Sequence, residues 1–182
     1  MKGFTRNNQR LSLCGLNCTL CPMYLGKYCP GCGGGAGNQP CKIARCGLAH
    51  NQIQYCSYCE KYPCEKYEAE EIYDSFISHR RRHDDLKRIL EIGEDAYDAE
   101  QQAKEEILLY LLQECNDGRR KSYYCQAVNL VSLPDLQTAL KAIREQVSDS
   151  DSKKERAVFA VRCLQDMADR AGIDLKLRKK KK

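Results

Sequence analysis

The chain has 182 residues, of which 13 are cysteine and 30% are charged, and its formal net charge is +5. It lacks the run of about 20 apolar residues that a membrane-spanning helix needs, and its start, MKGFTRNNQRLSL, lacks the apolar run of a secretory signal. We therefore expect a cytoplasmic protein, in which cysteines stay reduced and dense cysteines hold metal more often than they form disulfides.

The distribution of cysteines predicts two domains. Ten of the 13 cysteines lie between Cys14 and Cys64, in a segment rich in Gly and Pro and poor in Leu, Ile and Val. Such a segment buries little apolar surface by itself and commonly takes its folding free energy from bound metal. We predict a cysteine-rich metal-binding module over residues 1–64 and an α-helical domain with a basic C-terminal tail over residues 65–182.

The cysteines of the predicted module come in closely spaced groups. A Cys-x2-Cys pair in a tight turn directs two sulfurs to one point, and the amides of the turn hydrogen-bond to the thiolates, which suits tetrahedral zinc. In CPGCGG, Pro30 presets the turn and Gly33 tolerates a positive φ. The candidate metal ligands are Cys14, Cys18, Cys21, Cys29, Cys32, Cys41, Cys46, Cys56, Cys59 and Cys64.

Two four-cysteine zinc sites are the leading interpretation. In one arrangement the short, flexible segment GGGAGNQP folds Cys41 and Cys46 back onto the CPGC pair at 29–32. Cys56 and Cys59 then join two of the four remaining cysteines. In the interleaved alternative the first pair joins the third and the second joins the fourth, and the spacing does not decide between the two arrangements.

The opening Cys-x3-Cys-x2-Cys pattern also fits an iron-sulfur cluster. Radical enzymes that use S-adenosylmethionine bind a 4Fe-4S cluster with three cysteines at this spacing, but they surround it with a barrel for which this chain has too few strand-like runs. A plain 4Fe-4S cluster with Cys56 or Cys64 as its fourth ligand, in a redox or sensor protein, is the main alternative to zinc.

Several motifs of the chain occur together at a family-specific spacing. They are CGLNC-x2-CPMY, the CPGC pair, Cys41-x4-Cys46 and CSYCEKYPCEKYE, followed by RILEIGEDAYDAEQ, KSYYCQAVNL and LKLRKK. In these motifs the chain resembles the cysteine-rich family called domain of unknown function 3795. The resemblance implies a metal-binding protein and adds no mechanism.

After the cysteine-rich segment, the apolar periodicity predicts about five helices. Their expected ranges are 63–77, 80–93, 94–115, 134–147 and 152–172. Pro63 suits a first helical turn, Ser152 and Glu155 form a capping box, and Gly93 and Gly172 end helices. SYYCQAVNLV fits either a strand or a helix, and IDLKL fits a short strand or a tail. The predicted fold class is mainly α, with an irregular zinc-knuckle or ribbon-like segment packed on a helical bundle.

The remaining motifs give weaker indications. His79 and His83 share a helical spacing but flank three arginines, which favours a solvated helix face over a metal site. With ten cysteines at hand, His50 is a disfavoured ligand. GRRKSYY has the composition that binds single-stranded nucleic acid, although a surface turn whose tyrosines cover the core is preferred.

The sequence shows no motif of a known catalytic class. HExxH, a phosphate-binding glycine loop and GxSxG are all absent. We expect a non-catalytic protein in which two structural zinc ions fold a module that presents a surface to a protein partner. Nucleic-acid binding through the basic ends is a second alternative, after the iron-sulfur protein.

Overall fold

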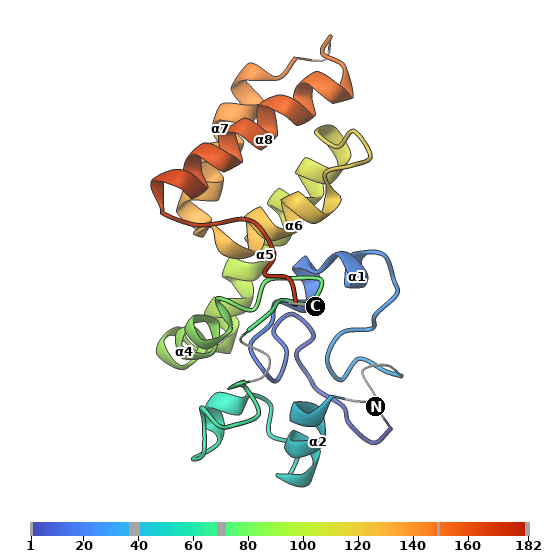
Figure 1. The fold of residues 1–182 in the computed structure, drawn as a ribbon, viewed down its shortest axis with the longest axis vertical. Coiled ribbons are helices and arrows are strands. Elements are labelled where there is room, and N and C mark those ends of the chain that lie inside the picture. Colours follow the sequence, from blue (N-terminus) through green and yellow to red (C-terminus); the bar gives the residue numbers. More distant parts are fainter. Residues whose placement is uncertain (1, 37–40, 69–71, 149, 181–182) are drawn as a thin grey trace. The chain divides into compact units, whose positions relative to one another are not determined.

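The computed structural model describes residues 2–36, 41–68, 72–148 and 150–180 (Figure 1). In these ranges the chain forms seven α-helices and two 3₁₀ turns, and none of them contains a strand. The predicted mainly α fold class is therefore confirmed. None of the described helices is both long and apolar enough to cross a membrane.

The chain folds into two compact units. The first contains Met1–Gln101 and Leu177–Lys182, and the second contains Gln102–Lys176. The boundary between them lies inside one long helix, α5 (Glu94–Glu114). The predicted cysteine-rich module is part of the first unit.

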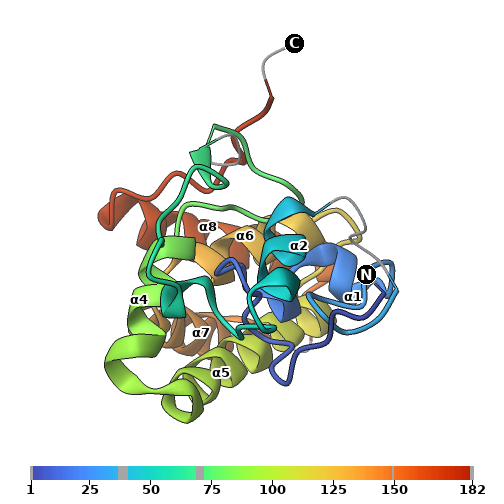
Figure 2. The same cartoon turned by 90° about the horizontal axis from the view of Figure 1, so that it is seen from below.

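The first unit consists of short helices joined by long loops, as Figure 2 shows for α1 and α2. Its elements are the 3₁₀ turn η1 (Cys18–Leu20), α1 (Pro22–Leu25), α2 (Lys42–Ala49), the 3₁₀ turn η2 (Cys56–Tyr58), α4 (Arg82–Ile92) and the start of α5. One apolar cluster consists of Phe4, Leu13, Cys14, Ile43, Ala44 and Tyr67. A second consists of Leu11, Tyr55, Leu86, Ile89 and Tyr97. Loops therefore supply much of this core.

Local sequence explains why α4 begins and ends where it does. Asp84 and Asp85 lie in its first turn, where carboxylates stabilise the helix dipole. Leu86 and Ile89 bury its inner face. Gly93 ends the helix with a φ of +83°, a conformation that favours glycine. The predicted helix is confirmed and begins two residues later than expected.

The second unit contains the end of α5 and the helices α6 (Lys121–Leu130), α7 (Leu133–Gln146) and α8 (Lys153–Arg170). Ser132 caps α7 by accepting a hydrogen bond from the backbone of Asp135, and the predicted capping box of Ser152 and Glu155 begins α8. The segment SYYCQAVNLV forms α6. Its residues from Tyr124 to Leu130 are all buried, which explains why no one-sided apolar pattern identified the helix.

The helix predicted for residues 63–77 is wrong for most of its described residues. Residues 63–67 form bends and turns and residues 72–77 form no helix, whereas Glu68 is helical and residues 69–71 lie outside the described residues. The backbone N–H of Asp74 donates to the carbonyl of Arg178 (2.9 Å) instead of to a preceding helical turn. IDLKL forms a tail without a strand, and the last two lysines of the chain lie outside the described residues.

Candidate metal centre

The loop from Cys14 to Cys18 turns back on itself. The backbone N–H of Ser12 donates to the carbonyl of Leu16 (2.8 Å), and the N–H of Cys18 donates to the carbonyl of Arg10 (2.7 Å). Gly15 has a φ of +89°, and a Cβ at this position would lie 2.2 Å from the carbonyl oxygen of Arg82. Glycine is therefore required for this loop to approach the start of α4.

The CPGC pair forms the turn that the sequence predicts. Gly31 and Gly33 have φ angles of +82° and +81°. A Cβ on Gly33 would lie 2.7 Å from Cγ of Arg6, so the turn packs closely on that side chain. Residues 37–40 of the following GGGAGNQP segment lie outside the described residues.

Helix α2, which the sequence analysis missed, separates Cys41 from Cys46. Cys41 is its N-cap, and the Cys41 sulfur accepts a hydrogen bond from the backbone of Ala44 (3.4 Å). Five residues of α-helix advance about 7.5 Å along the axis, so the two sulfurs belong to different parts of the unit. The signal for this helix was the apolar spacing of Ile43, Ala44 and Gly47, all of which are buried.

Cys14, Cys18, Cys32 and Cys41 affect one another's pKa values, and we call them the first cysteine group. Cys14 is part of the first apolar cluster, and Cys32 and Cys41 pack against it, as do Cys56 and Cys64. Burial, together with the neighbouring Cys32 thiol, raises the pKa of Cys14 to about 12. Burial and the same Cys32 thiol raise the pKa of Cys18. Cys14 is thus a buried thiol, and its neighbours Cys18, Cys32 and Cys41 are partly buried.

A second set, Cys46, Cys56, Cys59 and Cys64, is called the second cysteine group. These four side chains line one cavity of about 30 Å³, together with His50. His50 Nδ1 lies 3.6 Å from the Cys46 sulfur. Burial raises the pKa of Cys56 to about 11, and the adjacent Tyr67 hydroxyl opposes this shift. Turn η2 brings Cys56 and Cys59 together, with the Cys59 N–H donating to the Cys56 carbonyl (2.9 Å).

The last two candidate ligands are next to Cys18 of the first cysteine group. Cys21 and Cys29 line a hollow of about 350 Å³ with Cys18, Met23, Tyr24 and Tyr28. The structure thus groups the cysteines differently from both arrangements that the spacing suggested, because α2 places Cys41 in one group and Cys46 in the other.

All 13 cysteines lie in the described part of the chain, and none of them is in a disulfide. Among the described residues, no three or more cysteine, histidine or acidic side chains have the geometry of a formed metal site. The two groups are therefore clusters of thiols whose sulfur atoms would have to move together to coordinate an ion.

Two predictions about side features have clear outcomes. His79 is 7% exposed, and its Nε2 lies 2.9 Å from the Ser75 hydroxyl, so the predicted solvated face is wrong for this residue. His79 lies before α4 begins and packs inward. The preferred interpretation of GRRKSYY is confirmed for the packing of its tyrosines: Tyr124 is buried and donates to the Cys115 carbonyl (2.5 Å), and Tyr123 donates to the Val161 carbonyl (3.2 Å). Both tyrosines lie in α6 and not in the turn before it.

Comparisons with protein-family models, curated proteins and solved structures found no match to this chain.

Proposed function

We propose that this chain is a cytoplasmic zinc protein, similar to the domain of unknown function 3795 family, in which two structural metal ions fold a module that binds a protein partner. The first ion is held by the first cysteine group, Cys14, Cys18, Cys32 and Cys41. The second ion is held by the second cysteine group, Cys46, Cys56, Cys59 and Cys64.

The main support for this proposal is the arrangement of the second cysteine group. Its four thiols come from α2, η2 and the following loop, yet all of them line one cavity. A volume of about 30 Å³ accommodates one ion or one water molecule. Four thiols around such a space are the donor set of a closed structural zinc site.

The composition of the first unit supports a folding role for the metal. Most residues of this unit lie in loops, and its apolar clusters include cysteines that become charged thiolates when a metal binds. Metal binding to such a unit contributes directly to its folding free energy. A closed four-thiolate ion has no open position for substrate, so the metal stabilises a surface and takes no part in chemistry.

Paired serine variants test the assignment of ligands. Cys14→Ser/Cys18→Ser and Cys56→Ser/Cys59→Ser should each retain about one of two zinc ions per chain. Cys163→Ser in α8 is the matched control and should retain both. Inductively coupled plasma mass spectrometry of untagged protein provides the count. Unchanged zinc in either double variant would contradict the assignment, and iron with sulfide would favour a 4Fe-4S cluster.

A further inference from the structure

One buried hydroxyl beside the second cysteine group lacks a hydrogen-bond acceptor. Tyr67 is 2% exposed, and within the described part of the chain no atom accepts from its hydroxyl in hydrogen-bond geometry. Buried hydroxyls normally have a partner, because a buried polar group without one costs free energy comparable to a lost hydrogen bond. The position of this hydroxyl therefore indicates where an acceptor belongs in the first unit.

The Tyr67 ring is held from several sides. Its centre lies 5.4 Å from the centre of the Tyr62 ring and 5.0 Å from that of the His83 ring. The guanidinium carbon of Arg82 lies 4.4 Å from the centre of the Tyr67 ring. The Tyr67 backbone N–H donates to the carbonyl of Cys64 (3.0 Å), which belongs to the second cysteine group. These contacts fix the position of the ring next to that group.

The groups that surround the hydroxyl are thiols. Tyr67 lines the cavity of about 30 Å³ that the second cysteine group also lines, and Cys56 is the member of that group beside the hydroxyl. A neutral thiol accepts hydrogen bonds weakly, whereas a thiolate is charged and accepts a stronger one. Because cysteine binds metal as a thiolate, metal binding would supply the acceptor that the hydroxyl lacks.

We propose that the Tyr67 hydroxyl donates a hydrogen bond to the Cys56 thiolate when the second cysteine group holds its metal ion, which makes Tyr67 a positioning residue of that site. The inference rests on the proposed function. A donor behind a metal ligand orients the ligand and tunes its charge, and its loss weakens metal binding. The hydroxyl therefore favours the metal-bound state of one of the two sites.

Tyr67→Phe tests the inference, because it removes the hydroxyl and keeps the ring. It should weaken one of the two zinc ions by about 10–100-fold and leave the other unchanged. Competition with a fluorescent chelator measures both affinities. Tyr124→Phe in α6 is the matched control, since Tyr124 is also buried and its hydroxyl donates to the Cys115 carbonyl in the second unit. Both affinities should stay unchanged in the control.

Two backgrounds identify the ion that responds. Cys14→Ser/Cys18→Ser keeps the second site, and there Tyr67→Phe should weaken the remaining ion by the same factor. Cys56→Ser/Cys59→Ser keeps the first site, and there Tyr67→Phe should leave the affinity unchanged. Tyr67 shares an apolar cluster with Cys14, so a purely structural role would weaken the ion in the second background too. That result would overturn the inference.

Cobalt in place of zinc gives a readout that packing does not affect. A hydrogen bond to a thiolate lowers the energy of the sulfur lone pairs, so its loss should move the sulfur-to-cobalt absorption to longer wavelength. In the Cys14→Ser/Cys18→Ser background, where one site remains, Tyr67→Phe should show this shift and Tyr124→Phe should not. An unshifted spectrum in Tyr67→Phe would overturn the inference.

The failure of this inference differs from the failure of the proposed function. A wild-type chain without bound metal would refute the proposed function. Two zinc ions bound equally tightly by wild type and Tyr67→Phe would leave the proposed function intact and overturn the role of the Tyr67 hydroxyl.

Discussion

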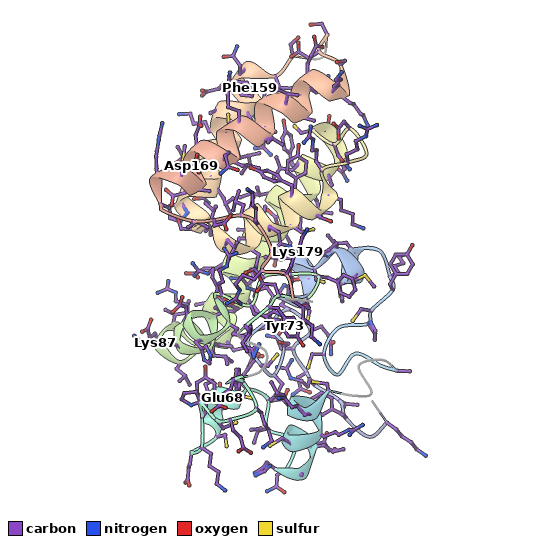
Figure 3. All side chains as sticks on the ribbon, in the orientation of Figure 1. Glu68, Tyr73, Lys87, Phe159, Asp169 and Lys179 are labelled. Atoms are coloured by element: carbon purple, nitrogen blue, oxygen red, sulfur yellow. The ribbon has the colours of Figure 1, made fainter. Side chains whose placement is uncertain are left out.

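Asp74 is bound on both of its carboxylate oxygens by Arg178, which follows it by 104 residues in the chain. Oδ1 accepts a hydrogen bond from Nη2 of Arg178 (2.7 Å), and Oδ2 accepts one from the Arg178 backbone N–H (2.8 Å). In Figure 3, the labels of Tyr73 and Lys179 mark the immediate neighbours of this pair. Both segments belong to the first unit, so the C-terminal segment is part of the unit that contains the N-terminal half of the chain.

Removing the Asp74 carboxylate should destabilise the first unit. Asp74→Ala leaves the N–H of His79, which donates to Oδ1 (2.9 Å), and the Arg178 guanidinium without their acceptor. Loss of hydrogen bonds to a buried charged group predicts a decrease of about 2 kcal/mol in the free energy of unfolding, measured with urea. Glu145→Ala on the exposed face of α7 is the control and should change it by less than about 0.5 kcal/mol. Equal effects of the two variants would contradict this account.

The Asp74 interaction should also depend on pH. Burial alone raises the pKa of Asp74, but the hydrogen bonds from Arg178 and His79 hold it below the ordinary value of 3.8. Because the folded pKa lies below the unfolded pKa, the stabilisation is complete above the unfolded pKa and is lost as pH falls through the folded pKa. The stability difference between wild type and Asp74→Asn should be constant near neutral pH and shrink below pH 3.8. Urea unfolding across this range checks the prediction, which a difference that grows on acidification would contradict.

Gly15 and Gly118 form a matched pair for testing the close approach of the Cys14–Cys18 loop to α4. Their φ angles are +89° and +88°, but a Cβ would clash with the Arg82 backbone only at Gly15, since nothing lies within 4 Å of it at Gly118. Gly118→Ala should cost about 1 kcal/mol for its backbone conformation, whereas Gly15→Ala should cost about 2–3 kcal/mol or more. Thermal or urea unfolding measures both, and equal losses would show that the loop tolerates a side chain.

Removal of metal should increase local unfolding in the first unit and leave the second unit unchanged. If the ions fold the first unit, a chelator should increase amide hydrogen exchange in η1, α2 and η2, because their backbone order depends on the bound ions. The helices α7 and α8 of the second unit have apolar inner faces with buried residues such as Leu136, Ile143 and Leu164, so their exchange should stay slow. Exchange that rises equally in both units would contradict a local folding role for the metal.

The sequence predicted the elements whose signals are local. Helices α4, α5, α7 and α8 have apolar periodicity and, at Gly93 and Ser152, terminal residues that act within one turn. Helix α6 remained ambiguous because it is buried on every side, and the segment 72–77 was predicted wrongly because Asp74 bonds to a residue 104 positions away. Periodicity carries no information about such a distant partner.

The spacing of the cysteines predicted the candidate ligands, but it did not predict which of them lie close together. Spacing suggested that Cys41 and Cys46 act together, and helix α2 separates them. The sequence did not predict the burial of Arg6 and Arg82. Arg6 lies in a polar N-terminal segment and Arg82 in a run of three arginines, and both patterns are typical of exposed residues. Only the burial of both side chains distinguishes them from their neighbours.

The central claim is that the two cysteine groups hold structural zinc. Its most direct test is the metal content of untagged protein purified without oxygen, measured together with its ultraviolet-visible spectrum. The account predicts about two zinc ions per chain and no visible colour, because zinc has a filled d shell. Iron with matching sulfide and a brown colour that bleaches in air, or a folded chain without metal, would contradict it.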